Sequence, residues 1–358
     1  MFYNRFMIYR YFLFCLIFIK ILSPPLLYSE DFTKLSSNDS VSIPRDLYYR
    51  DNFASQWWYF TGHLENDSGK SFGYETTFFI VNVNNEKFKS PFGLNRVYML
   101  HSAITDINKH KYYYKNTLSR GAYNVAGFSA DKKIVWVFDS YLKGNIDNFE
   151  IYSKNDNFSI NLELTAMKNP VKNGDNGYSR KVDSCEECAS LYFSITRLKT
   201  TGEINLNGKT YNVKGISWFD REINSDYDAT KIKGWDWFSV QLNDGRDIML
   251  YLLRDQGGDI ENVSMGTIVY PDSSYRTIKL KDFDIKVLSH YRSKKTGKKY
   301  PSKWYIRIPS ENLDLKVIPL VKDQEFIPSE MNIPIYWEGA CVVEGSVNGK
   351  AYVELTGY

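Results

Sequence analysis

A motif that occurs twice restricts the folds open to this chain. The sequence QWWYFTGHLEND begins at Gln56, and GWDWFSVQLND, which aligns with it, begins at Gly234. Each copy is followed by a turn that contains glycine and then by an apolar segment, at 74–81 and at 248–253. Asp244-Gly245 is typical of a hairpin turn, because both residues tolerate positive φ. Each copy therefore predicts a β-hairpin.

A second motif is also duplicated. NGKTYNVKG begins at Asn207, and NGKAYVELTG begins at Asn348. An opening and a closing motif thus occur twice in the same order, which is typical of two tandem copies of one fold. The sequence predicts one domain over residues 46–225 and a second over 232–358.

Strand patterns dominate the chain after its first 45 residues. Apolar residues alternate with polar ones at 158–164, 191–195, 304–308 and 313–317. A period of two is typical of half-buried strands. Since no long amphipathic segment predicts a helix there, we expect an all-β fold of sandwich or barrel type.

The first 29 residues have the pattern of an export signal. Arg5 and Arg10 precede an apolar segment at 11–22, and Ser29 offers a small residue for cleavage. We expect an exported protein, periplasmic or secreted, with an uncleaved N-terminal anchor as the alternative. Residues 30–45 are polar and are predicted to form a flexible lead-in.

The composition favours an apolar small-molecule or lipid partner over a nucleic acid. The net charge is +3 and aromatic residues make up 16% of the chain. There is no nucleic-acid motif, whereas tyrosine and tryptophan line apolar pockets as well as cores. The basic segment 294–299 is expected at a hairpin tip, either solvated or in contact with an anionic membrane surface.

Cysteines and histidines indicate no metal site and no cofactor. Cys185 and Cys188 form a CxxC pair outside any βαβ context, which in an oxidising compartment favours a local disulfide. Cys341 is expected to be a buried free thiol. The four histidines lack the HxH and HxxxH spacings of metal ligands.

The stretch from Ser217 to Trp237 carries the candidate catalytic residues. Asp220 and Glu222, at i and i+2, are expected on one side of an extended strand, with Arg221 on the other. Two neighbouring carboxyls push their pKa values apart, so one can stay protonated and act as an acid. Asp236 is the third candidate. The alternative is a structural ion-pair network with Arg221 or Arg254.

Several long motifs resemble one family. They are QWWYFTGHL, HSAITD, GYSRK, SWFDRE, GWDWFSVQLNDGRDIMLYLLR and YWEGACVVEGSVNGKAYVELTGY. From about Asp46 to Tyr358 the chain resembles the AttH family, whose members are named as predicted secreted hydrolases and are related to bacterial carotenoid 1,2-hydratases (hydroxyneurosporene synthases). The resemblance implies two tandem lipocalin-like β-barrels. The sequence reads Trp-Phe-Asp-Arg-Glu where the carotenoid hydratases are rich in histidine, so the carotenoid substrate is not carried over.

The aromatic residues near these carboxylates are candidates for binding the substrate. A tryptophan can stabilise a carbocation through its π-face. GYSRK, one of the family-like segments, adds a tyrosine and an arginine, and YWEG adds Glu338 as a weaker candidate. The candidate binding residues are Trp218, Trp235, Trp237, Trp57, Tyr178 and Arg180.

Three hypotheses for the function follow. The first is a cofactor-independent hydrolase or hydratase that acts on a lipid or isoprenoid-like substrate at the barrel–barrel interface, since interfaces between domains often hold pockets. The second is a non-catalytic lipid or isoprenoid carrier that serves an ABC-type envelope transport system. The third is a carbohydrate-binding module with a flat aromatic platform.

Overall fold

Alternating apolar residues build the strands of this protein. In β9 (Phe158–Ala166), the four residues Phe158, Ile160, Leu162 and Leu164 are buried, and the residues between them are not. The computed structural model describes residues 32–83, 93–129, 134–225, 231–330 and 333–358. The predicted export signal at 1–29 lies outside this range. Where the sequence predicts a flexible lead-in, Leu35 and Val41 are buried against the first core.

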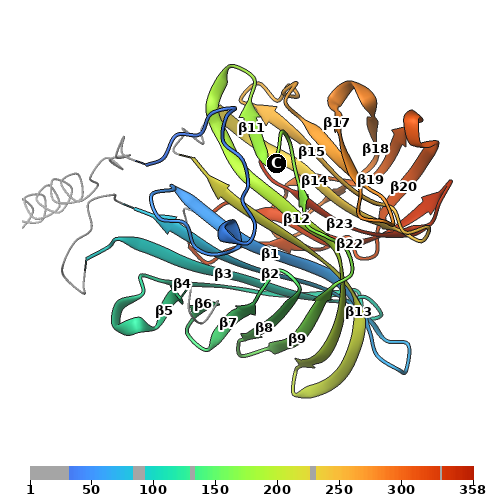
Figure 1. The fold of residues 1–358 in the computed structure, drawn as a ribbon. Coiled ribbons are helices and arrows are strands. Elements are labelled where there is room, and N and C mark those ends of the chain that lie inside the picture. Colours follow the sequence, from blue (N-terminus) through green and yellow to red (C-terminus); the bar gives the residue numbers. More distant parts are fainter. Residues whose placement is uncertain (1–31, 84–92, 130–133, 226–230, 331–332) are drawn as a thin grey trace, which may run out of the picture. The chain divides into compact units, whose positions relative to one another are not determined.

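The first sheet holds thirteen strands among the described residues, and all of its pairs are antiparallel (Figure 1). Its main order is β4-β3-β2-β1-β13-β12-β9-β8-β7-β6-β5, with β10 and β11 paired to β12. Its strands are β1 (Ser55–Glu65), β2 (Ser71–Asn82), β3 (Arg96–Asp106), β4 (Lys111–Ser119), β5 (Ala126–Ser129), β6 (Ile134–Val137), β7 (Ser140–Gly144), β8 (Asn148–Lys154), β9, β10 (Val171–Lys172), β11 (Tyr178–Val182), β12 (Cys185–Leu206) and β13 (Lys209–Asn224).

The second sheet holds ten strands in the described part of the chain. Its main order is β17-β16-β15-β14-β23-β22-β20-β19-β18, with β21 paired to β22. Its strands are β14 (Ile232–Leu242), β15 (Asp247–Asp255), β16 (Met265–Val269), β17 (Tyr275–Lys279), β18 (Asp284–Arg292), β19 (Lys299–Ile308), β20 (Leu313–Pro319), β21 (Glu325–Phe326), β22 (Tyr336–Gly345) and β23 (Gly349–Leu355). Four short 3₁₀ turns are described: η1 (Arg45–Leu47), η2 (Ala122–Asn124), η4 (Leu280–Asp282) and η5 (Pro309–Glu311).

The duplicated motifs occupy equivalent places in the two sheets. The opening hairpins are β1–β2 and β14–β15, and the closing motifs fall on β13 and β23. In both sheets the opening strand pairs with the closing strand, β1 with β13 and β14 with β23. The predicted all-β class with two curled, barrel-like sheets is confirmed.

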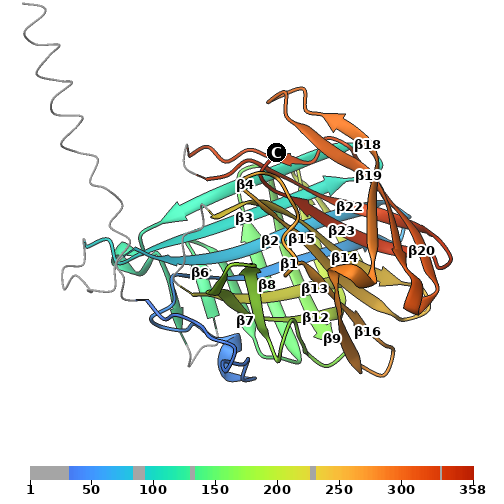
Figure 2. The ribbon, with the colours of Figure 1, turned by 90° about the horizontal axis from the view of Figure 1, so that it is seen from above.

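The two sheets pack against each other (Figures 1 and 2). The three largest clusters of buried apolar side chains lie inside each sheet and between them. Phe60 and Phe219 belong to the core inside the first sheet, and Trp304 and Trp337 belong to the core inside the second. A third cluster, which includes Trp237, joins the sheets. Residues 31–358 form one compact unit, and the predicted division at 46–225 and 232–358 stays a prediction.

A buried ion cluster also fastens the sheets together. Asp247 of β15 is fully buried and pairs with Lys168 (Nζ–Oδ2 2.6 Å) and with Arg197 (Nη2–Oδ1 2.6 Å), both from the first half of the chain. The Lys168 ammonium also donates to the carbonyl of Gly245 at 2.6 Å. Because each charge has a partner, their burial is compensated.

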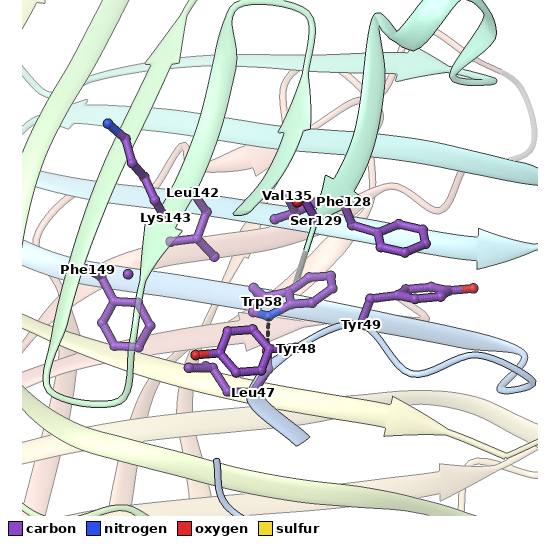
Figure 3. Close-up of a pocket in the computed structure, with 11 residues that line it drawn as sticks. Leu47, Tyr48, Tyr49, Trp58, Phe128, Ser129, Val135, Leu142, Lys143 and Phe149 are labelled. Carbon is purple, nitrogen blue, oxygen red and sulfur yellow. Dashed lines mark hydrogen bonds between the residues drawn. The ribbon is translucent and has the colours of Figure 1, made fainter. Parts of the chain in front are cut away.

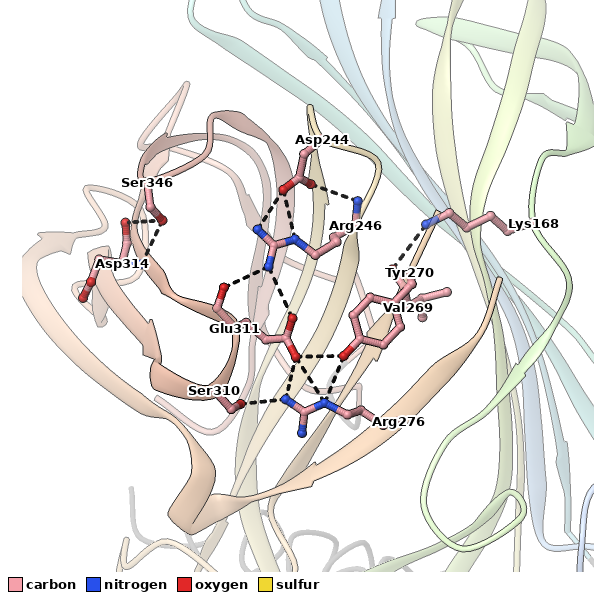
Figure 4. A network of polar contacts seen from close by, with 10 residues as sticks. All are labelled: Lys168, Asp244, Arg246, Val269, Tyr270, Arg276, Ser310, Glu311, Asp314 and Ser346. Atoms are coloured by element: carbon pink, nitrogen blue, oxygen red, sulfur yellow. Dashed lines mark hydrogen bonds and ion pairs between the residues drawn. The ribbon is translucent and has the colours of Figure 1, made fainter. Parts of the chain in front are cut away.

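A second polar network fixes η5 within the second sheet (Figure 4). Glu311 accepts hydrogen bonds from Arg276 (2.6 Å), the Tyr270 hydroxyl (2.8 Å) and Arg246 (3.3 Å). Arg246 also pairs with Asp244 of the predicted hairpin turn. One carboxylate therefore holds three strand-end side chains in place.

Cysteine and membrane-span predictions can also be compared with the structure. A disulfide joins Cys185 to Cys188, with a Cα–Cα distance of 5.3 Å, and Cys341 is a buried free thiol. Among the described residues, no helix has the length and apolar character needed to cross a bilayer.

Candidate active site

A cavity of about 160 Å³ lies between the two sheets. Aromatic side chains form most of its wall, and four ionisable groups reach it from both sheets. Its lining residues are Trp57, Tyr59, Thr77, Phe79, Lys181, Tyr192, Asp220, Glu222, Asn224, Ile232, Trp235, Trp237, Tyr251, Leu253 and Glu354. Apolar pockets with a few convergent polar groups are the usual form of a small-molecule site.

Strand alternation brings the predicted carboxylates to this cavity. In β13, Asp220 and Glu222 line the cavity, whereas Phe219 and Ile223 belong to the core inside the first sheet. Asp220 lies directly opposite Tyr59 of β1, and Glu222 lies opposite Trp57 of the same strand. Asp220 and Glu222 therefore lie on one side of the strand, as their i, i+2 spacing predicts.

Three side chains donate hydrogen bonds to Asp220. They are the hydroxyl of Ser194, the indole N–H of Trp218 (2.8 Å) and the hydroxyl of Tyr192 (3.0 Å). Burial raises the pKa of Asp220 to about 7, and the negative charge of Glu222 adds to the rise, although the three donors favour the carboxylate. Asp220 is therefore divided between acid and carboxylate near neutral pH.

Glu222 has a cation as its partner. The Lys181 ammonium and the Ser190 hydroxyl (2.5 Å) both donate to Glu222 Oε1. The same ammonium lies 5.3 Å and 5.1 Å from the ring centroids of Tyr192 and Tyr251, within the range of cation–π attraction. Glu222 is thus held as one half of a buried ion pair.

Arg221 faces the opposite side of β13, as the strand period predicts. Its guanidinium carbon lies 3.9 Å from the ring centroid of Trp58. It donates to the carbonyls of Asp46 (3.1 Å) and Tyr48 (3.0 Å) and to Gln56 Oε1 (2.7 Å). The alternative in which Arg221 neutralises the two cavity carboxylates does not match this arrangement.

Asp236 is separated from the other two catalytic candidates. Trp235 and Trp237 line the cavity, so Asp236 between them points to the other face of β14. There it pairs with Arg254 and accepts a hydrogen bond from the Tyr358 hydroxyl at 2.7 Å. We correct its interpretation to a structural ion pair, which is the arrangement that the Arg254 alternative described.

Three candidate binding residues also lie away from the cavity lining. Trp218 is buried behind Asp220, with its ring centroid 6.0 Å from that of Trp237. The Tyr178 hydroxyl donates to the carbonyl of Glu186 (2.5 Å), and Arg180 is exposed. In β11 it is Lys181, one residue further on, that reaches the cavity. Trp57, Trp235 and Trp237 do line it.

The cavity residues that sequence reasoning missed include Lys181, Tyr192 and Glu354. They come from β11, β12 and β23, which are distant from one another along the chain. Tyr192 connects the sheets, because its hydroxyl accepts from the Trp237 indole N–H (3.1 Å) and donates to Asp220. Of these three, only Lys181 is next to a predicted residue, since it follows Arg180 in the GYSRK segment.

A second cavity, of about 130 Å³, lies beside the core of the first sheet (Figure 3). Trp58 and Phe149 form part of its wall, and the Trp58 indole N–H donates to the carbonyl of Leu47 at 2.7 Å. Lys143 reaches this cavity but pairs with Glu150 (2.9 Å). Since no carboxylate is among its described lining residues, it does not offer the acid–base groups of the first cavity.

Two histidines are buried near the sheet–sheet interface. His63 bonds through Nε2 to the carbonyl of Ala351 (2.9 Å), and burial lowers its pKa to about 4. His101 contacts the Tyr336 hydroxyl through Nδ1 (2.8 Å), and burial lowers its pKa to about 3. In the described part of the chain, no group of three or more His, Cys, Asp or Glu has the arrangement of a metal site.

Comparisons with known proteins now identify the family. A family model described as AttH-like matches residues 34–358. A protein assigned as AttH from Nitrosomonas europaea has a similar structure, with 26% identity and a TM-score of 0.83 over 91% of this chain and 100% of that one. No curated protein matches the sequence.

Two more distant structures share the fold. Kievitone hydratase from Nectria haematococca is 17% identical, with a TM-score of 0.69 over 91% of this chain and 96% of its own. CghA, solved with Sch210972, is 10% identical, with a TM-score of 0.56 over 92% of this chain and 97% of its own. With the family model matching nearly the whole of it, this chain belongs to the AttH-like family.

Proposed function

We propose that this protein is a hydratase-like enzyme that adds water to a carbon–carbon double bond of an apolar, lipid or isoprenoid-like substrate, or removes it, in the cavity between the sheets. The observation that carries this proposal is Asp220: a buried carboxyl with a pKa of about 7, placed in the wall of an aromatic cavity. A general acid works best when its pKa lies near the working pH.

The groups at the cavity account for each step of a hydration. The Asp220 carboxyl gives its proton to one alkene carbon, and the π electrons form the new C–H bond. The faces of Trp235 and Trp237 stabilise the positive charge on the other carbon. The lone pair of a water molecule then forms the C–O bond, and the added water loses one proton to a carboxylate of the cavity. Dehydration runs through the same steps in reverse.

The ion pair of Glu222 and Lys181 has a different task in this scheme. The ammonium donates to the Glu222 carboxylate and lies over two tyrosine rings, so both groups are held in place. Fixed charges at a dry site stabilise developing charge without reorganisation. We assign this pair to orienting water and substrate.

The shared fold with kievitone hydratase supports a hydratase over a hydrolase. The disulfide between Cys185 and Cys188 supports export, because such bonds persist in oxidising compartments. The predicted signal at 1–29 lies outside the described residues. N-terminal sequencing of the exported protein measures whether the signal is removed.

Hydration is tested with geraniol, farnesol and squalene in water labelled with ¹⁸O. Wild-type protein should yield an alcohol heavier by one labelled water molecule, as measured by mass spectrometry. Asp220→Asn should lower the rate by ~10²–10⁴-fold with an unchanged melting temperature. The matched control is Asp156→Asn, an exposed carboxylate in a loop. Binding of these alkenes without labelled product would favour the carrier and contradict the proposal.

A further inference from the structure

Glu354 faces the cavity from the second sheet, opposite the Asp220 side. In β23 it lies directly across from Trp237 of β14 on one side and from Glu338 of β22 on the other. Directly opposed residues share one face of a sheet. Asp220 and Glu222 come from the first sheet, so both sheets contribute carboxyls to the cavity.

No cation neutralises Glu354 within the described parts of the chain. The ion pairs there include Glu222 with Lys181, but none for Glu354 or Glu338. Like charges directly opposite each other are destabilising in a sheet. Glu338 accepts a hydrogen bond from the hydroxyl of Tyr59 at 2.6 Å, and Tyr59 also lines the cavity. Two carboxyls are thus kept together without a counter-ion at the wall of the site.

This arrangement differs from that of Glu222. The charge of Glu222 already has a partner in the Lys181 ammonium. Glu354 has no such partner, and it keeps the capacity to exchange a proton. Hydration moves one proton to carbon and takes another from water, and a second exchanging group besides Asp220 allows the two transfers to occur at opposite ends of the double bond.

We propose that Glu354 is the second proton-transfer residue of the cavity, and that Glu338 is a positioning residue that acts through Glu354 and Tyr59. In the direction of hydration, Glu354 takes the proton that the added water loses, while Asp220 gives its own proton to carbon. The site returns to its first state when a proton passes from Glu354 to Asp220 through water. This assignment rests on the proposed function for its chemistry, but the position of Glu354 does not.

The protonation of Glu354 fits this role. Burial raises its pKa to about 7, and the charges of Glu222 and Asp220 contribute, while the Trp235 indole opposes the rise. Burial also raises the pKa of Glu338, together with the charges of Glu75 and Glu354. The titratable groups around the cavity and its carboxyl cluster are Tyr59, Glu75, Lys181, Tyr192, Asp220, Glu222, Tyr251 and Glu338.

Calorimetry with benzyltrimethylammonium tests the assignment without turnover. This probe carries a permanent charge and an apolar ring, so it mimics a carbocation between aromatic walls. A cation in the cavity favours the carboxylates, and protons are released. Titrations at pH 7 in two buffers of different ionisation enthalpy give the number released. With two groups about half protonated, wild type should release up to ~1 proton, half of it from Glu354.

The variants separate the outcomes. Glu354→Gln should release about half as many protons as wild type and should bind the probe ~10-fold more weakly, whereas Glu344→Gln, an exposed change on β22, should match wild type. Glu354→Asp keeps a carboxyl and should keep the release. An equal release by wild type and Glu354→Gln overturns the assignment, as does loss of release in Glu354→Asp or a wild type that fails to bind. If wild type releases protons as expected but hydrates no alkene, Glu354 is still a proton-exchanging residue of the cavity, and only the proposed hydratase activity is contradicted.

Discussion

The protonation of another buried glutamate makes the stability of this fold depend on pH. Glu75 of β2 is 1% exposed and accepts a hydrogen bond from the Thr77 hydroxyl through Oε1. Its Oε2 has no partner among the described residues. Burial raises the pKa of Glu75 to about 8, and the charge of Glu354 adds to the rise. The carboxyl is therefore protonated in the folded protein at neutral pH.

The sign and size of the effect follow from this shift. Because the folded-state pKa is raised, the contribution of Glu75 is fully present below pH 4.5 and is lost as the pH rises toward 8. At ~1.4 kcal/mol per pKa unit, keeping the proton on Glu75 costs about 1 kcal/mol at pH 5. At pH 8, where half of the folded molecules have lost the proton, the cost is about 4 kcal/mol. Wild type should therefore lose about 3 kcal/mol of unfolding free energy through Glu75 over this range.

Glu75→Gln should remove that loss, because an amide does not titrate and still accepts from Thr77. Urea unfolding followed by tryptophan fluorescence at pH 5, 6, 7 and 8 measures it. The variant should be close to wild type at pH 5 and more stable by about 3 kcal/mol at pH 8. Glu163→Gln, an exposed change on β9, is the control. Parallel pH dependence of wild type and Glu75→Gln would show that Glu75 ionises normally and would refute the reasoning.

Two further predictions concern the polar networks. Asp247→Asn leaves Lys168 and Arg197 without their shared carboxylate, so the free energy of unfolding at pH 7 should fall by about 3–5 kcal/mol, against no change in Asp156→Asn; equal denaturation midpoints would contradict a buried ion cluster. Glu311→Gln should cost about 2 kcal/mol at pH 7. The hydrogen bonds from Arg276, Tyr270 and Arg246 hold the pKa of Glu311 below its usual value despite partial burial. The loss of stability in Glu311→Gln should therefore shrink as the pH falls below 4.5. A loss that does not depend on pH would contradict this prediction.

The duplicated motifs predicted more of the fold than composition did. They fall on strands that pair with each other in both sheets, so the repeat reflects the shared strand order of the two sheets. The period of two also separated Asp220 and Glu222 from Arg221. Both features are local or repeated along the chain, and a sequence records them directly.

The period of two also explains why three candidates were wrong. Asp236, Tyr178 and Arg180 were predicted at the site because residues next to them in the sequence suggested it. Asp236 was grouped with Asp220 because tryptophans flank it, yet flanking residues of a strand point to the opposite face. In β11 the polar residue that reaches the cavity is Lys181, one position after Arg180. A slip of one residue exchanges the two faces of a strand.

The sequence contains one indication of Glu354, a difference between the two closing repeats, which the structure explains. Its repeat NGKAYVE aligns with NGKTYNV, so an acid stands where the first copy has Val213. Val213 is buried in an apolar core, but Glu354 lies opposite Trp237 as Asp220 lies opposite the aligned Tyr59, and it is beside Glu338. A half-buried carboxyl without a cation costs free energy that an apolar residue would not. Elsewhere this protein pairs its buried acids, Asp247 with Lys168 and Asp236 with Arg254. Departures from such local rules concentrate at functional sites, and the unpaired acids of this interface lie around an aromatic cavity that both sheets line.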